Sequence, residues 1–259
     1  MRILKLFGHI LIVLILTTLT QVGGVIWLVS VLISNRLKKK KRFVFPILYL
    51  TFNLLIIPPV ASYFGRERLP VFSYVLKPRH WMYSILCRNY VSSELKVYLK
   101  RSSEKLSASG ISITYLDANF PFIDGFPLFP HLSHNDGKKI DISFQYLDKT
   151  GKATDKKPSV SGYGAYVKED SDYSSKCEVL DYWQYDMTKY LTFGTINDLR
   201  LDKKNTKVLI QELLSQSNAQ KLFIEPYLKR ELGLSNYSKI RFHGCQAVRH
   251  DDHIHFQIK

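Results

Sequence analysis

The chain has 259 residues, 46 % of them hydrophobic, and its 37 Lys and Arg against 22 Asp and Glu give a formal net charge of +15. This length allows one ordinary domain with an additional segment, and the three cysteines are too few for a disulfide scaffold. The charge favours an anionic neighbour, but no Lys/Arg-rich helix, aromatic ribonucleoprotein motif or zinc-finger spacing is present, so nucleic acid is not an expected partner.

Two long apolar runs fill most of the first 62 residues. Residues 6–33 and 43–62 contain no Asp, Glu, Lys or Arg, and each run reaches the roughly 20 residues that a bilayer-spanning helix needs. We predict an N-terminal two-helix transmembrane hairpin over residues 1–62, followed by a separate domain over residues 63–259. A cleavable signal peptide is the alternative for the first run, which is longer than the usual apolar core of such a peptide.

A basic loop between the two runs sets the expected orientation. Residues 36–42 carry six Lys and Arg, whereas only Arg2 and Lys5 precede the first run. The positive-inside rule therefore places this loop in the cytoplasm, with both termini facing outward. If Gly23 and Gly24 break the first run, so that it does not span cleanly, the topology inverts.

Helix and strand patterns alternate after the apolar runs. Serines at 92–93 offer an N-cap and Gly110 a stop for a helix, and residues 111–116 predict a strand. Residues 140–147 alternate strictly between apolar and polar side chains, which predicts a half-buried strand. Asp141 lies on the face of this strand that points away from the apolar one.

The C-terminal third of the chain continues this mixture. Residues 148–175, rich in Gly, Ser, Lys and Asp, predict a long loop, and residues 205–217 and 226–232 predict helices that flank a strand. Residues 253–259 predict a last strand. Among the three cysteines one bridge is possible in an oxidising compartment, and the sequence does not choose the pair.

Five of the eight histidines fall into two short clusters, "HLSHNDGKKID" at residues 131–141 and "RHDDHIHFQI" at residues 249–258. In the second cluster the strand period of two places His253 and His255 together on the polar face. His9 and His80 have no partner in sequence and His243 lies on a strand of its own, so all three are expected to be structural.

Histidine and aspartate in this arrangement predict a metal site. Three imidazole or carboxylate ligands, with a fourth position open to water, are typical of catalytic zinc, whereas structural zinc is usually closed by four ligands that include cysteines. No cysteine lies within either cluster. We therefore expect a zinc site of the catalytic type.

The spacing HxxHxxGxxxD, formed by His131, His134, Gly137 and Asp141, is followed far downstream by HxxHxH, formed by His250, His253 and His255. This pattern resembles the penicillin-insensitive murein endopeptidases, over roughly residues 124–259. These belong with the lysostaphin-type peptidases, the D-Ala-D-Ala carboxypeptidases and dipeptidases, and the hedgehog zinc domain. The resemblance implies an α+β domain with a small central antiparallel sheet and flanking helices.

The resemblance also implies roles for individual residues. His134, Asp141 and His255 would be the Zn²⁺ ligands, while His250 and His253 would act as general base or transition-state stabiliser. Asp252 is the rival base, since related dipeptidases use an acid three residues before the last ligand. A further site-lining residue would be His131. Arg249 could pair with a substrate carboxylate or be a plain surface charge.

The implied reaction is hydrolysis of the D-alanyl to meso-diaminopimelyl cross-link between peptidoglycan stem peptides, by a zinc-activated water. With the apolar runs, this predicts an enzyme of the bacterial inner membrane whose catalytic domain faces the periplasm. A D,D-carboxypeptidase or dipeptidase acting on wall peptides is one alternative. A catalytically silent, zinc-containing binding module of the cell envelope is another.

Overall fold

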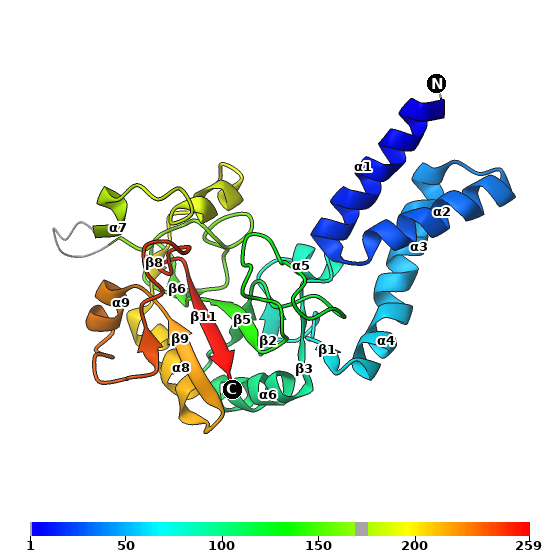
Figure 1. The fold of residues 1–259 in the computed structure, drawn as a ribbon. Coiled ribbons are helices and arrows are strands. Elements are labelled where there is room, and N and C mark those ends of the chain that lie inside the picture. Colours follow the sequence, from blue (N-terminus) through cyan, green and yellow to red (C-terminus); the bar gives the residue numbers. More distant parts are fainter. Residues whose placement is uncertain (1, 169–175) are drawn as a thin grey trace. The chain divides into compact units, whose positions relative to one another are not determined.

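The computed structural model describes residues 2–168 and 176–259 of the chain (Figure 1). Its contacts form two compact units, described in turn. Unit one comprises Met1–Leu69, Met82–Lys96 and Ala118–Gly137, and unit two comprises Pro70–Trp81, Val97–Asp117 and Lys138–Lys259. The boundary predicted between residues 62 and 63 stays a prediction, and residues 169–175 of the predicted long loop lie outside the described residues.

Unit one begins with a series of apolar helices. These are α1 (Arg2–Thr20), α2 (Gly23–Leu37), α3 (Lys41–Thr51), the π-helix η1 (Phe52–Ile56) and α4 (Ile57–Tyr63). Two stretches, Ile3–Thr20 and Lys41–Tyr63, are long and apolar enough to cross a membrane. Only 6 % of the first and 17 % of the second is buried, so their apolar side chains need a covering that the described residues do not supply.

The first apolar run is two helices rather than the single span that we predicted. Gln21 adopts a left-handed conformation with φ 65°, which ends α1, and α2 begins at Gly23. A Cβ atom on Gly24 would lie 2.1 Å from Thr17 Oγ1 and 2.8 Å from the carbonyl oxygen of Val13. Glycine at this position therefore lets α2 turn back and cross α1 closely.

Polar contacts show which ends of these helices lie together. Trp27 Nε1 in α2 donates to His9 Nδ1 in α1 at 3.1 Å, and the other ring nitrogen of His9 lies 3.1 Å from Lys41 Nζ. His9 thus joins all three helices. The basic loop before α3 and the N-terminal half of α1 lie at the same end of unit one.

The rest of unit one packs onto these helices. Its elements are β1 (Arg66–Arg68), α5 (Met82–Ile85) and β3 (Tyr90–Ser92), and β1 pairs antiparallel with β3. Asn53 in η1 is buried and its side-chain amide donates to the carbonyl oxygens of Ser84 and Ile85 at 3.1 and 3.2 Å. Ile57 and Cys87 belong to one apolar cluster, so the end of the second apolar stretch is part of a protein core.

Unit two contains the central sheet, and the predicted α+β class is confirmed. The strands are β2 (Leu76–Pro78), β4 (Ile113–Tyr115), β5 (Lys139–Ser143), β9 (Ala219–Phe223), β10 (Ile240–Arg241) and β11 (His253–Ile258), in the order β10-β9-β11-β5-β4-β2. The three inner pairs are antiparallel, as expected, whereas the two edge pairs, β10 with β9 and β2 with β4, are parallel.

Helices cover this sheet close to where the sequence predicts them. They are α6 (Ser93–Ser107), α8 (Lys203–Ser215) and α9 (Pro226–Glu231). The Tyr98 hydroxyl in α6 donates to the carbonyl oxygen of Leu213 in α8 at 2.5 Å, and the Tyr98 ring packs on Phe256 of β11 at 5.3 Å. Two helices far apart in sequence therefore lie against the central strand.

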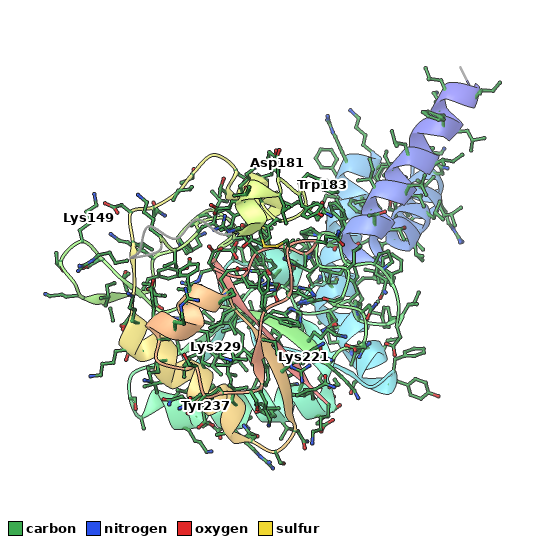
Figure 2. The ribbon with its side chains drawn as sticks, turned by 60° about the vertical axis from the view of Figure 1, so that its left-hand side comes forward. Lys149, Asp181, Trp183, Lys221, Lys229 and Tyr237 are labelled. Atoms are coloured by element: carbon green, nitrogen blue, oxygen red, sulfur yellow. A yellow bond between two sulfur atoms is a disulfide. The ribbon has the colours of Figure 1, made fainter. Side chains whose placement is uncertain are left out.

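A second sheet, in the order β7-β6-β8, lies in the region after β5. Its strands are β6 (Tyr146–Leu147), β7 (Ala153–Thr154) and β8 (Arg200–Leu201), with α7 (Lys176–Val179) and the 3-10 helix η2 (Met187–Thr192) between β7 and β8. The strand predicted over 140–147 is split, because the backbone of Gln145 bonds to Asp202 and Thr206. Cys177 and Cys245 form a disulfide. Trp183, in the same region, is 68 % exposed, and Figure 2 labels it.

Candidate metal centre

Adjacent positions on β5 and β11 carry the predicted ligands of unit two. His255 is opposite Asp141 in the antiparallel register, and His253 is opposite Ser143. Both strands are central, so helices and loops cover both sheet faces, and Asp141, His253 and His255 are at most 3 % exposed. The prediction of a half-buried strand is therefore wrong, because its polar face is buried as fully as its apolar face.

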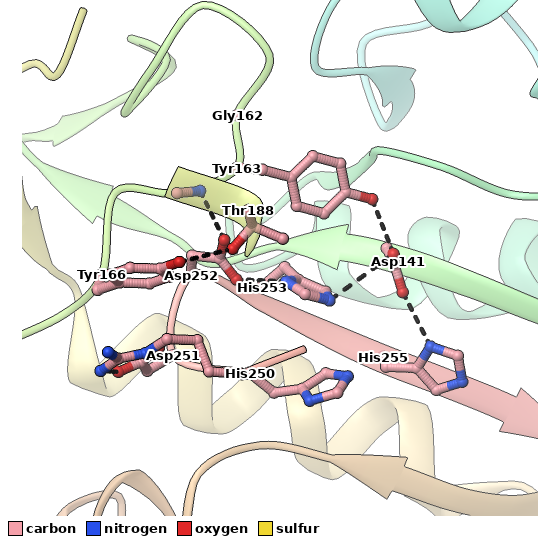
Figure 3. Close-up of polar contacts among 12 residues, drawn as sticks. Asp141, Gly162, Tyr163, Tyr166, Thr188, His250, Asp251, Asp252, His253 and His255 are labelled. Carbon is pink, nitrogen blue, oxygen red and sulfur yellow. Dashed lines mark hydrogen bonds and ion pairs between the residues drawn. The ribbon is translucent and has the colours of Figure 1, made fainter. Parts of the chain in front are cut away.

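Asp141 lies between two imidazoles (Figure 3). Its Oδ1 is 3.0 Å from His255 Nδ1, and its Oδ2 is 3.7 Å from His253 Nε2. The Tyr163 hydroxyl donates to Oδ2 at 2.7 Å and accepts from the backbone N–H of Asp117 at 3.1 Å. A buried carboxylate with these partners is held in one orientation.

Sequence reasoning missed Tyr163, which lies inside the predicted long loop. Glycines flank it on both sides, with φ 101° at Gly162 and 77° at Gly164, conformations that L side chains rarely adopt. The only local signal was therefore a tyrosine between two glycines. Its ring meets the His253 ring edge to face, with centroids 5.0 Å apart.

Asp252 is placed to orient His253. One of its carboxylate oxygens is hydrogen-bonded to His253 Nδ1, and the other accepts from the backbone N–H of Gly164 at 2.6 Å (Figure 3). This leaves Nε2 as the ring nitrogen of His253 that faces Asp141. The geometry suits an orienting role for Asp252 better than the role of rival base.

His250 and His243 complete a group of imidazoles. The His250 ring lies 4.8 Å from that of His253 and 5.8 Å from that of His255. Its Nδ1 is buried and has no hydrogen-bond partner among the described residues. His243 stacks on Phe223 at 4.4 Å and lies 5.3 Å from His250, so it borders the group rather than standing apart as expected.

Charge preferences differ between the two fully buried histidines that precede His255. Burial opposes protonation of His253, but Asp252 and Asp141 outweigh it and raise its pKa to about 9. Burial lowers the pKa of His250 well below its ordinary value, and the neighbouring imidazoles of His253 and His255 act in the same direction. At neutral pH one ring favours the imidazolium and the other the neutral form.

Arg249 is neither a surface charge nor a free ligand for a substrate carboxylate. Its Nε donates to Asp251 Oδ1 at 2.7 Å, a second bond joins it to Oδ2, and Nη1 bonds to Glu178 and Asp186 at 3.0 and 3.2 Å. Its guanidinium also lies over the Tyr166 ring at 4.0 Å. Because these carboxylates occupy the guanidinium fork, Arg249 holds the turn before β11.

Glu225 anchors the same turn and was also missed from the sequence. Its Oε1 accepts from the backbone N–H of His250 at 3.0 Å, and its Oε2 accepts from the Tyr185 hydroxyl at 2.9 Å. Burial raises its pKa to about 7, and the charge of Asp251 acts in the same direction. The position of His250 therefore depends on an acid after β9 that no sequence motif marks.

The first histidine cluster forms a compact turn in unit one. His134 Nδ1 lies 2.7 Å from the carbonyl oxygen of Ala118, and the rings of His131 and His134 are 5.6 Å apart. Both residues are buried. The N–H of Gly137 donates to Asn119 Oδ1 at 3.0 Å, with Gly137 at φ 77°, so the motif glycine closes the turn.

Buried histidine and aspartate side chains of this chain could hold a metal ion. In unit two these side chains are Asp141, His253 and His255, and in unit one they are His131 and His134. Two imidazoles and one carboxylate are the donor set of many catalytic zinc sites. None of the cysteines takes part, since two form the disulfide and Cys87 is buried beside Asn53.

Comparison of the sequence with protein-family models finds no match, and comparison with curated proteins finds no relative. The resemblance to murein endopeptidases therefore rests on the spacing of the motif residues alone.

Proposed function

We propose that this chain is a membrane-anchored zinc metallopeptidase that cleaves peptide cross-links of peptidoglycan. The observation that supports it best is the register of β11 against β5, which sets His255 opposite Asp141 in a buried setting. These two residues belong to motifs more than 100 positions apart in sequence, and they carry the donor atoms that the resemblance to murein endopeptidases assigns to zinc.

The zinc ligands in this proposal are His134, Asp141 and His255. Zinc bound there would polarise the scissile carbonyl and lower the pKa of a coordinated water. Tyr163 holds the Asp141 carboxylate through its hydroxyl at 2.7 Å. The ring of His250, whose buried Nδ1 has no hydrogen-bond partner among the described residues, lies 4.8 Å from that of His253.

Two histidines outside the ligand set serve proton transfer and charge stabilisation in this proposal. Asp252 holds His253 by Nδ1, so Nε2 points into the group and can exchange a proton with the reacting amide. His250, held at its backbone by Glu225, faces His253 from the next position of the turn. His131 lines the site in this assignment.

The apolar helices support a membrane location in this proposal. Since the N-terminal half of α1 and the basic loop lie at one end of unit one, the positive-inside rule assigns both to the cytoplasm. The N-terminus would then be cytoplasmic rather than outward, while the end of α4 still leads to the opposite side. We assign the catalytic part to the periplasm of a bacterial inner membrane, where the Cys177–Cys245 disulfide is stable.

The test is zinc content and peptidoglycan cleavage by the full chain in detergent. Wild type is compared with His255→Ala and with His80→Ala, a histidine outside the group. Each protein is incubated with purified peptidoglycan and with isolated muropeptides. We expect one zinc per chain and conversion of cross-linked dimers to monomers in wild type and His80→Ala, and loss of both in His255→Ala.

Other outcomes separate the alternatives. Release of D-alanine from monomeric pentapeptides without cleavage of dimers would assign a carboxypeptidase. Zinc without any hydrolysis would assign a binding module. A wild-type chain that binds no zinc would contradict the proposed site.

A further inference from the structure

Gln21, in the turn between α1 and α2, makes unusual contacts with the segment that carries His131 and His134. Its Oε1 accepts from the backbone N–H groups of Phe122 and Ile123 at 2.9 and 3.4 Å, and its Nε2 donates to the carbonyl oxygen of Ile123 at 3.5 Å. One buried side chain thus serves three backbone groups of a distant loop. Such groups are costly to leave unsatisfied when they are buried.

The backbone of Gln21 adopts a strained conformation, which accompanies this contact. Its φ of 65° lies in the left-handed region, which costs a residue other than glycine roughly 1–2 kcal/mol. Glycines follow at 23 and 24, so the turn uses glutamine where glycine would be easier locally. The hydrogen bonds of its side chain supply a physical reason for that choice.

The loop comprises residues 118–137, with residues 118–125 as its first arm and residues 134–137 as its second. Apolar packing and an ion pair hold the first arm against the helices. Phe122 packs on the apolar cluster formed by α2, α4 and the segment after α5, and its ring meets that of Phe64 at 5.8 Å. Arg66, just after α4, pairs with Asp124 and donates to the carbonyl oxygen of Asp136 at 2.5 Å. Arg66 therefore bridges the two arms of the loop.

Further bonds carry this constraint to the histidines. The N–H of Gly125 in the first arm donates to the carbonyl oxygen of Asn135 in the second at 2.9 Å. His134 Nδ1 lies 2.7 Å from the carbonyl oxygen of Ala118, at the start of the first arm. A Cβ on Gly137 would lie 1.7 Å from Arg66 Nη1, so the guanidinium lies directly against the backbone of the second arm.

From these contacts we infer that the apolar helices are part of the scaffold of the metal centre, and that Gln21 is a positioning residue for the loop that presents His134. This inference rests on the proposed zinc site. It predicts that the anchor cannot be removed without loss of metal affinity, so a chain beginning near residue 63 would be a poor substitute for the full protein.

The experiment uses the full chain in detergent and three variants. Gln21→Gly removes the side chain while relieving the backbone strain, so the turn itself is preserved. Gln21→Glu keeps an oxygen acceptor for the N–H groups of Phe122 and Ile123. Thr51→Val is the matched control, because this exposed hydroxyl bonds only to Ile47 of its own helix. Zinc affinity is measured by chelator competition, and ligand geometry by visible absorption of Co²⁺-loaded protein.

We expect Gln21→Gly to weaken zinc binding about tenfold or more and to alter the Co²⁺ bands, with Gln21→Glu restoring most of both and Thr51→Val unchanged. Wild-type affinity and spectrum in Gln21→Gly would overturn the inference and leave the proposed function intact. If wild type binds no metal, the proposed function fails. Amide hydrogen exchange of residues 118–137 then tests by itself whether Gln21 holds the loop. Equal protection in wild type and Gln21→Gly would overturn the positioning role of Gln21.

Discussion

Two polar clusters lie at the start of β11, and they differ in how their charges are balanced. The arginine cluster, formed by Arg249, Asp251, Asp186 and Glu178, pairs one guanidinium with three carboxylates, of which Asp251 is fully buried and Glu178 is 45 % exposed. The histidine cluster gathers the imidazoles of His243, His250, His253 and His255 beside the carboxylates of Asp141 and Asp252, and all of these residues except His243 are buried. Ion pairs that neutralise one another within the protein indicate a structural role. A cluster with more imidazole nitrogen donors than carboxylates is instead suited to binding a metal cation from solution.

We expect substitutions in the two clusters to have different effects on metal binding and on stability. Loss of a group from the histidine cluster should remove metal binding with little effect on folding. Loss of a group from the arginine cluster should destabilise the fold.

Asp141→Asn should weaken zinc binding by about a thousandfold or more, roughly 4 kcal/mol, because the amide replaces the only carboxylate of the proposed ligand set. Zinc per chain after dialysis against a metal buffer measures this. The control is Asp198→Asn, which alters an exposed aspartate paired with Lys149. Full zinc occupancy in Asp141→Asn would remove this residue from the ligand set.

Arg249→Met should lower the free energy of unfolding by about 3–5 kcal/mol, because it leaves the fully buried Asp251 without its charge partner. Denaturant titration of the detergent-solubilised protein measures the loss. Glu178→Gln, which removes the more exposed partner of the same guanidinium, should cost under about 1 kcal/mol. Equal losses in the two variants would show that burial does not distinguish these pairs.

Glu225→Gln should change how stability depends on pH. Since the pKa of Glu225 is raised to about 7 in the folded protein, the native state holds a proton that the unfolded state releases near its ordinary value. The resulting stability is fully present below the unfolded pKa and is lost as pH rises through about 7, a change of roughly 3 kcal/mol.

The variant cannot ionise at this position, so it should be more stable than wild type at pH 8 and similar at pH 4 to 5. Asp251, whose pKa burial raises to about 6, should leave a smaller slope in both proteins. Unfolding free energies at several pH values test this. Parallel curves for the two proteins would show that Glu225 is ionised throughout.

Tyr163→Phe should weaken zinc binding by about 10- to 100-fold without unfolding the protein, because it removes only the hydroxyl that holds Asp141. Chelator competition measures the affinity. Tyr190→Phe is the matched control, since Tyr190 is 71 % exposed. Unchanged affinity in Tyr163→Phe would mean that Asp141 is oriented by its strand alone.

Much of the fold could be predicted because local patterns carry it. Period-two alternation marked β5 and β11, and caps and stops marked α6, α8 and α9 within a few residues. The same alternation brought His253 and His255 to one face, and their spacing to His134 and Asp141 predicted a metal site. These features depend on neighbours in sequence, which is why a single chain reveals them.

Other features depend on contacts between distant segments. The left-handed turn at Gln21 breaks an apolar run that composition alone makes continuous, because residues 122 and 123 accept and donate hydrogen bonds there. Tyr163 and Glu225 lie in segments with no motif, and tertiary hydrogen bonds bring Tyr163 to Asp141 and Glu225 to His250.

By itself the sequence determined the α+β class, the apolar stretches and the set of histidine and aspartate donors. Only the tertiary structure decided that both faces of β5 and β11 are buried, that Cys177 pairs with Cys245, and that Arg249 is paired inside the protein. The physical reason is that side-chain periodicity is local, whereas burial and charge pairing depend on which distant segments cover each residue.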